Sequence, residues 1–204
     1  MTTDTVVLAT AWINQPALAQ RPARTLLVGA ATLTCRYRFG SLGLDLATHS
    51  TTVTDDPAET ISWLADAFHI PPARLLLWRA EDIVVPSLIA AAETARDTIA
   101  AARLLRELDL VFTSEVIDVA ETYGGASATS FDAVAHGAGI PFVPMPRAGL
   151  AEAHRLGNHG AIREHLAARA KATWRLWLTG RQDTGSLIAA TEAWASTPDA
   201  EVRL

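Results

Sequence analysis

The segment Gly157–Gly180, GNHGAIREHLAARAKATWRLWLTG, predicts one long helix. Gly157 and Asn158 precede it and Gly180 follows it, where start and stop signals of a helix are expected. Apolar side chains recur at helical spacing, at Ile162, Leu166, Ala170, Trp174 and Trp177. On the helical wheel, Arg169 falls beside this apolar stripe. We therefore expect Arg169 at the inner side of the helix, although many such arginines only extend along the edge of a core to reach water.

Strand patterns precede this helix. Apolar runs that alternate with polar residues, or that are rich in β-branched residues, predict strands over residues 5–12, 25–38, 42–53, 74–79 and 110–113. Helices are expected after Asp55-Asp56-Pro57, which supplies an N-cap and an early proline, and over most of residues 83–108. Residues 116–119 are expected to open a further helix or turn, and residues 183–195 to form a last helix.

The order of these elements predicts one mixed sheet. The first three strands follow one another closely and can form an antiparallel meander, whereas the last two need helical crossovers and so pair in parallel. We expect an α/β fold with a mixed five-stranded sheet flanked by helices, which is the ribonuclease H-like arrangement. Residues 1–204 are expected to form a single domain, with residues 182–204 as a C-terminal helical extension.

Composition narrows the class of protein. Half of the residues are apolar, which excludes a disordered chain. The N-terminus lacks a signal-peptide pattern, no apolar segment is long enough for a membrane span, and the lone Cys35 offers neither an internal disulfide nor a metal cluster. A cytoplasmic protein is expected. The net charge of −5 argues mildly against a dedicated nucleic-acid binder, yet the basic residues between 146 and 182 could meet phosphate or simply form a solvated face.

Four phrases stand in order along the chain: VVLATAW at Val6–Trp12, LLLWRAEDIVVPSL at Leu75–Leu88, VIDVAETYGGASATSFDAVAHGAGIP at Val116–Pro141, and IREHLAARAKATWRLWL at Ile162–Leu178. Together they resemble the ribonuclease H-like 3′–5′ exonucleases of the DEDD proofreading type. The nearest group is the bacterial exonucleases similar to the exonuclease domain of family B polymerases. The resemblance implies a site in which four carboxylates bind two divalent metals, Mg²⁺ or Mn²⁺, that activate water and stabilise the leaving oxygen.

Other residues occupy all four carboxylate positions that the resemblance implies. The Asp-x-Glu of the first strand falls on Ala9 and Ala11, the aspartate of the second motif on Val84, and that of the last motif on Arg169. A tyrosine four residues before the last position falls on His165. Alanine and valine offer no oxygen ligand to Mg²⁺ or Mn²⁺. We therefore expect no catalytic residues and no metal cofactor.

Other carboxylates leave an alternative open. Asp82, with Glu81 beside it, enters the cleft if the alignment slips slightly. Asp118 matches an aspartate that, by the resemblance, supports the site rather than binding metal. Glu115, Asp118 and Glu121 would share one face if this segment were helical. These acids could rebuild a site for Mg²⁺ or Mn²⁺, or act only as surface and capping residues.

Arg169 carries the most specific expectation. Its guanidinium is expected to point into the cleft at the carboxyl end of the first strand, near Ala9 and Ala11. There it would pair with Asp118 or Asp82, or receive a phosphate, because a planar fork of donors suits both partners. The alternative is a rotated helix with Arg169 on the outer surface.

Three functions follow from these observations. The first, which we favour, is a catalytically degenerate exonuclease-like protein that binds single-stranded nucleic acid or a replication or repair protein; its candidate binding residues are Arg169, His165, Asp82, Asp118, Arg147 and Arg155. The second is an active 3′–5′ exonuclease with rearranged carboxylates. The third is a structural subunit of a homo-oligomer, assembled through its tryptophan-rich last helices.

Overall fold

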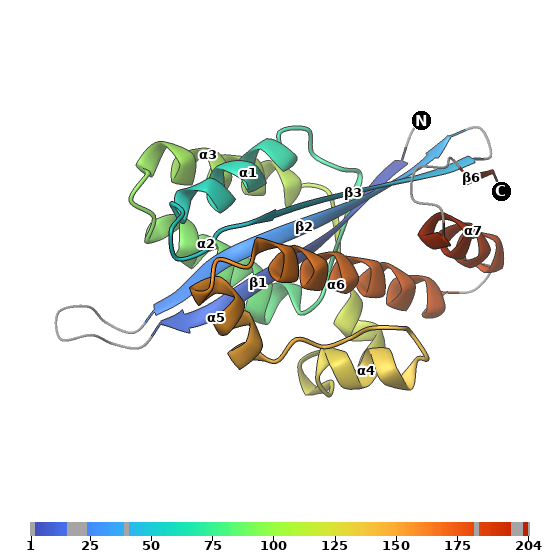
Figure 1. Ribbon diagram of the computed structural model, residues 1–204. Coiled ribbons are helices and arrows are strands. Elements are labelled where there is room, and N and C mark those ends of the chain that lie inside the picture. Colours follow the sequence, from blue (N-terminus) through green and yellow to red (C-terminus); the bar gives the residue numbers. More distant parts are fainter. Residues whose placement is uncertain (1–2, 16–23, 39–40, 182–183, 197–201, 204) are drawn as a thin grey trace.

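A mixed sheet of six strands runs through the computed structural model, which describes residues 3–15, 24–38, 41–181, 184–196 and 202–203 (Figure 1). The strand order is β5-β4-β1-β2-β3-β6. The strands are β1 (Thr3–Gln15), β2 (Arg24–Arg38), β3 (Ser41–Ser50), β4 (Arg74–Leu77), β5 (Glu115–Asp118) and β6 (Val202–Arg203). The first four lie where the sequence predicted strands.

The strand directions confirm the predicted pairing. Strands β1, β2 and β3 form an antiparallel meander, while β4 pairs in parallel with β1, and β5 in parallel with β4. The short strand β6 pairs with the start of β3. The C-terminal segment that was expected to be helical therefore contains a helix and then this two-residue strand.

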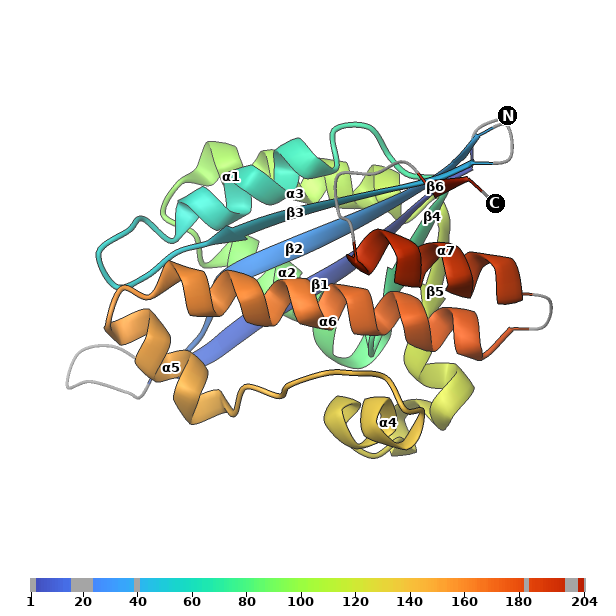
Figure 2. The same ribbon diagram turned by 45° about the vertical axis from the view of Figure 1, so that its right-hand side comes forward.

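Helices cover both faces of the sheet (Figures 1 and 2). On one face lie α1 (Ala58–Ala67), α2 (Val85–Glu93) and α3 (Thr98–Val111). On the other, α6 (His159–Thr179) crosses β1, β2 and β3, with α5 (Arg147–Arg155) and α7 (Gly185–Ser196) beside it. Shorter elements connect these layers: the π-helical turn η1 (Ala80–Val84), the 3₁₀ turns η2 (Val119–Tyr123) and η3 (Gly125–Ser127), and α4 (Phe131–Gly137).

Strand β1 lies at the centre of two apolar cores. Successive side chains of a strand point to opposite faces, so Val7, Ala9 and Ala11 pack beneath α6, whereas Leu8 packs with α1, α2 and α3. All four are buried. The small side chains of Ala9 and Ala11 leave room on the α6 side, which is the side on which Arg169 lies.

Helix α6 confirms the prediction for Gly157–Gly180. The Asn158 side chain accepts a hydrogen bond from the backbone N–H of Ala161 at 3.0 Å and so caps the helix. Ile162 and Leu166 are fully buried against the sheet. Trp174 and Trp194 are also buried within the chain, and these two rings are therefore not available to an interface between copies.

The prediction for the fifth strand was wrong. Leu110 and Val111 end helix α3, and the strand follows at Glu115–Asp118. Leu104, Leu108 and Val111 continue the buried face of α3 at helical spacing, so the apolar run at 110–113 belongs mainly to the helix. Residues 116–118, expected to open a helix or turn, are a strand instead. Glu115, Asp118 and Glu121 consequently share no helical face.

The helices were compared with the length and apolar character of a membrane-spanning helix. Within the described ranges, none combines the length and the apolar character needed to cross a membrane.

Candidate functional site

A pocket of about 260 Å³ lies along the edge of β1 where β4 ends. Strand β4 pairs with β1 only through Thr5–Val7, so the next residues of β1 have no strand beside them on that edge. Three arginines line the pocket with three aromatic rings and four hydroxyl groups, from Arg79, Arg147, Arg169, Trp12, Trp78, Phe131, Thr10, Thr129, Ser130 and Thr173. No carboxylate is among the described residues that line it. We call it the arginine pocket.

The arginine pocket brings together three of the four positions at which the sequence resemblance implied carboxylates. Ala9 on β1, Val84 at the end of η1 and Arg169 on α6 all line it. Ala11 does not line the pocket and lies in the core beneath α6. The carboxyl end of a sheet's parallel strands is a common place for ligands to bind, and this pocket lies at the carboxyl end of β4.

Arg169 extends from α6 over the ring of Phe131, with its Cζ atom 4.2 Å from the ring centroid. Burial lowers the pKa of its guanidinium, and the carboxylate of Asp132 offsets part of this effect. The expected pairing with Asp82 or Asp118 was wrong, because within the described parts of the chain no carboxylate lies at ion-pair distance from Arg169. An arginine guanidinium stays charged in proteins, and that of Arg169 lines the pocket with no side-chain hydrogen bond to an acceptor among the described residues.

Asp118 holds the turn that ends β4. Its two carboxylate oxygens accept hydrogen bonds from the backbone N–H groups of Arg79 at 2.8 Å and Ala80 at 2.7 Å, and one of them also accepts from Ala120 at 2.9 Å. Arg79 has a φ of 58°, which is costly for a residue with a side chain. The three hydrogen bonds stabilise this conformation, which directs Arg79 into the pocket wall.

Asp82 is also engaged, because its carboxylate forms an ion pair with the side chain of Arg79 three residues earlier. This pair lowers the pKa of Asp82. The carboxylate of Asp82 thus partly neutralises the positive charge that Arg79 brings to the arginine pocket. For Arg147 and Arg169 the described residues include no acidic partner within ion-pair distance.

The carboxylates in this part of the molecule do not fit a two-metal site. Ala9, Ala11 and Val84 have no oxygen ligand, and Arg169 places a positive charge among them. Glu115 pairs with Arg74 at 2.7 Å. Asp118 accepts hydrogen bonds from backbone N–H groups, and Asp82 pairs with Arg79. Within the described ranges, no three His, Cys, Asp or Glu side chains are placed to hold a metal ion.

His165 lies one helical turn before Arg169 and contacts the ring of Phe142, with ring centroids 6.1 Å apart. Its Nδ1 atom is buried and has no hydrogen-bond partner in the described part of the chain. Burial, together with the nearby charge of Arg169, lowers the pKa of His165 to about 4. The ring is not part of the pocket lining; it lies behind Arg169 as a neutral imidazole.

The free energy of unfolding is expected to fall as the pH drops from 6.5 toward 4, partly because of His165. Its imidazole takes up a proton near its ordinary pKa of 6.5 in the unfolded chain but only near pH 4 in the folded one. The unfolded state therefore binds more protons in this window, which destabilises the fold. Urea unfolding of His165→Leu should show a shallower pH slope than the unsubstituted protein.

A matched control for this measurement is His136→Leu, since that ring is exposed on α4. Burial also lowers the pKa values of His49 and His154, so some slope remains in both variants. An equal slope in the two variants would contradict the role given to His165.

The other candidate binding residues separate in space. Arg147 lines the arginine pocket, whereas Arg155 at the end of α5 is exposed, pairs with Glu152 at 2.6 Å and lies outside it. Sequence reasoning missed Trp12, Trp78 and Phe131 as pocket residues. One signal was available: Trp78 lies near the end of the strand predicted at 74–79, where side chains reach the carboxyl edge of a sheet.

Comparison of the chain with protein-family models gives no match, and comparison with curated proteins gives no significant match.

Proposed function

We propose that this protein is a catalytically degenerate relative of the ribonuclease H-like 3′–5′ exonucleases, and that it binds single-stranded nucleic acid in the arginine pocket without cutting it. The observation that carries the proposal is a pocket lined by Arg79, Arg147 and Arg169 and by no carboxylate of the described residues. A phosphate group would meet there the guanidinium groups of Arg147 and Arg169, which have no acidic partner among the described residues. Arginine suits phosphate because its donors form a planar fork.

The sheet supports the fold part of this proposal. An antiparallel meander followed by two parallel strands, in the order β5-β4-β1-β2-β3, is the arrangement that the ribonuclease H-like resemblance implies. The shared pocket of Ala9, Val84 and Arg169 adds support, because residues far apart in sequence meet where the resemblance implies the site to be. Fold likeness alone does not assign an activity.

The aromatic rings of the pocket favour a nucleic acid over a bare phosphate. Trp12, Trp78 and Phe131 line the same space as the arginines, and Trp78 packs edge-on against Phe131 at 5.1 Å between ring centroids. Proteins that bind single strands combine cationic side chains with rings on which bases stack. A base could lie against these rings while its phosphate meets Arg147 or Arg169.

The test is fluorescence anisotropy with a labelled single-stranded oligonucleotide, DNA and RNA in turn, at several salt concentrations and with EDTA present. We expect binding that weakens with salt, because each phosphate contact on a single strand adds about −0.7 to the slope of log K against log salt. The same 3′-labelled strand should stay intact with Mn²⁺.

Two outcomes would overturn the proposal. Mn²⁺-dependent 3′–5′ cleavage that is removed both by EDTA and by Asp82→Ala would favour an active enzyme with rearranged carboxylates. Absence of binding to both DNA and RNA would favour a protein partner instead.

A further inference from the structure

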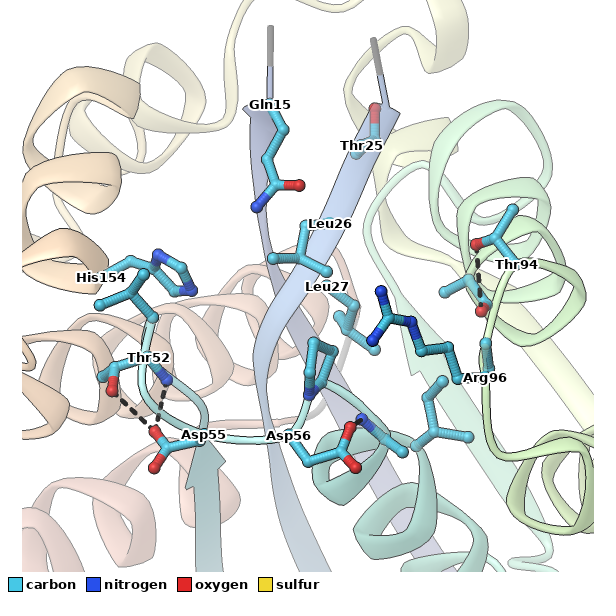
Figure 3. A pocket seen from close by; sticks show the side chains of 16 residues that line it. Gln15, Thr25, Leu26, Leu27, Thr52, Asp55, Asp56, Thr94, Arg96 and His154 are labelled. Carbon is cyan, nitrogen blue, oxygen red and sulfur yellow. Dashed lines mark hydrogen bonds between the residues drawn. The ribbon is translucent and has the colours of Figure 1, made fainter. Parts of the chain in front are cut away.

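A second pocket, of about 360 Å³, lies where β1 ends and β2 begins (Figure 3). The end of β1, the start of β2, the loop between β3 and α1, the end of α2 and His154 of α5 enclose it. We call it the loop pocket. It shares no lining residue with the arginine pocket, so its ligand is independent of the function proposed above. Its volume is in the range of small-molecule sites.

The two aspartates of the loop pocket differ in how they are used. One oxygen of Asp55 accepts hydrogen bonds from the backbone N–H and the hydroxyl of Thr52, at 2.6 and 2.7 Å, and lies 3.2 Å from Nε2 of His159. Asp55 therefore fixes the loop. Asp56 accepts one bond through Oδ1, from the N–H of Ala58 at 2.9 Å. Within the described residues its Oδ2 atom has no partner.

Two further polar groups face the loop pocket without a partner among the described residues. Figure 3 shows the guanidinium of Arg96 and the ring of His154 extending into it from opposite walls. Burial lowers the pKa of His154, so the imidazole is neutral and supplies a hydrogen bond rather than a charge. Arg96 is thus the single cation among the described lining residues.

The charges decide which ligands fit. Two carboxylates and one guanidinium line the loop pocket. A ligand that carries only negative charge would be repelled by the two carboxylates. A ligand with both an ammonium and a carboxylate meets Asp56 and Arg96 with opposite charges. Beside the polar Thr25, Thr52 and Thr94, the lining has an apolar part that includes Leu27, Ile61 and the exposed Val53. An apolar side chain of the ligand can pack on this part.

We infer that the loop pocket binds a small amphipathic zwitterion, namely a free α-amino acid with an apolar side chain. The ammonium lies at Asp56, the carboxylate lies at Arg96, and the side chain packs over Leu27 and Ile61. A charge-assisted hydrogen bond contributes more than a neutral one, so both charged ends are needed for binding.

Isothermal titration calorimetry with three probes tests this inference on the full chain. L-Leucine carries both charged groups, isocaproate lacks the ammonium, and isoamylamine lacks the carboxylate. We expect leucine to bind, and each truncated probe to bind at least about tenfold more weakly, as expected for the loss of one charged contact. Arg96→Gln should weaken leucine binding by a similar factor and should not weaken the binding of isoamylamine, which has no carboxylate.

Asp56→Asn is the complementary variant, because asparagine keeps the acceptor for the N–H of Ala58 and removes the charge. It should weaken the binding of leucine and should not weaken the binding of isocaproate, which has no ammonium and loses only a repulsion. Arg103→Gln is the matched control: Arg103 is a cation of α3 that pairs with Asp66 and does not line the loop pocket. No heat with leucine at millimolar concentration would overturn the inference, as would equal binding of leucine and isocaproate.

Discussion

Replacing Arg169 with methionine is expected to weaken single-strand binding by about ten- to a hundredfold, which corresponds to one hydrogen-bonded charge. The same change is expected to stabilise the fold by about 1 kcal/mol, because a half-buried charge with no carboxylate partner among the described residues is costly. Binding and stability thus change in opposite directions. This result is specific to an arginine kept for a ligand, since a purely structural arginine would lose stability on substitution.

The stability part of this prediction rests on a balance of local terms. The Arg169 guanidinium lies 4.2 Å from the ring of Phe131, and such a contact contributes about 0.5–2 kcal/mol. A methionine sulfur on the same ring replaces about 0.3–1.5 kcal/mol of this. Desolvation of the charge, which lowers the pKa of Arg169, then decides the sign.

Thermal unfolding and anisotropy on the same preparations would measure both effects. Arg163→Met is the matched control, because Arg163 lies on the same helix, is exposed, and contacts Ser50 rather than the arginine pocket. Its binding should stay within about twofold of the unsubstituted protein, since a distant surface charge acts weakly at physiological salt. An Arg169→Met protein that binds normally but unfolds more easily would show that Arg169 is structural.

Gly29→Ala is expected to lower the free energy of unfolding by about 3 kcal/mol. Gly29 lies on β2 between Ala11 of β1 and Ser50 of β3. A Cβ atom there would stand 2.7 Å from the carbonyl oxygen of His49 and 2.8 Å from Cδ1 of Leu166. The first of these atoms belongs to the backbone of the sheet, so relief requires that the strand or α6 shift. Overpacking of this kind typically costs about 1–3 kcal/mol.

The stabilising effect of a Gly→Ala substitution, which opposes this cost, is smaller. Alanine reduces the conformational freedom of the unfolded chain and so stabilises by about 0.4–1 kcal/mol where it fits. Gly137→Ala isolates that term, because a Cβ atom on Gly137 at the end of α4 would meet no heavy atom within 4 Å. Urea unfolding should therefore show Gly137→Ala to be neutral or slightly stabilised. Equal stability of Gly29→Ala and Gly137→Ala would contradict the close packing of α6 on β2.

The sequence by itself determined those helices and strands whose residue pattern is local, namely α6 and β1 to β4. The 3.6-residue spacing from Ile162 through Leu166 and Ala170, with Asn158 as cap, was sufficient to predict α6. The apolar and alternating runs were sufficient for β1 to β4. The order of strands and helices then restricted the pairing, because closely spaced strands pair antiparallel and distant ones need crossovers.

The same local rules failed at the fifth strand for an identifiable reason. Leu110–Phe112 is apolar and compatible with a strand, but Leu104, Leu108 and Val111 extend the buried stripe of α3, and the helix continues. The true strand at Glu115–Asp118 contains two acids and is at most half-buried. Its pairing with β4 is a long-range contact, which local propensity does not contain.

Only the tertiary structure decided what the charged residues do. The sequence placed Arg169 beside the inner stripe of its helix, but the packing of α6 over β1 and against Phe131 set it in a pocket with Arg79 and Arg147. By residue type, Asp118 is a candidate metal ligand. In the fold, its two carboxylate oxygens accept hydrogen bonds from backbone N–H groups of the turn after β4. Hydrogen bonds and charges act over a few ångströms in space, and the distances between segments far apart in sequence are fixed only when the chain has folded.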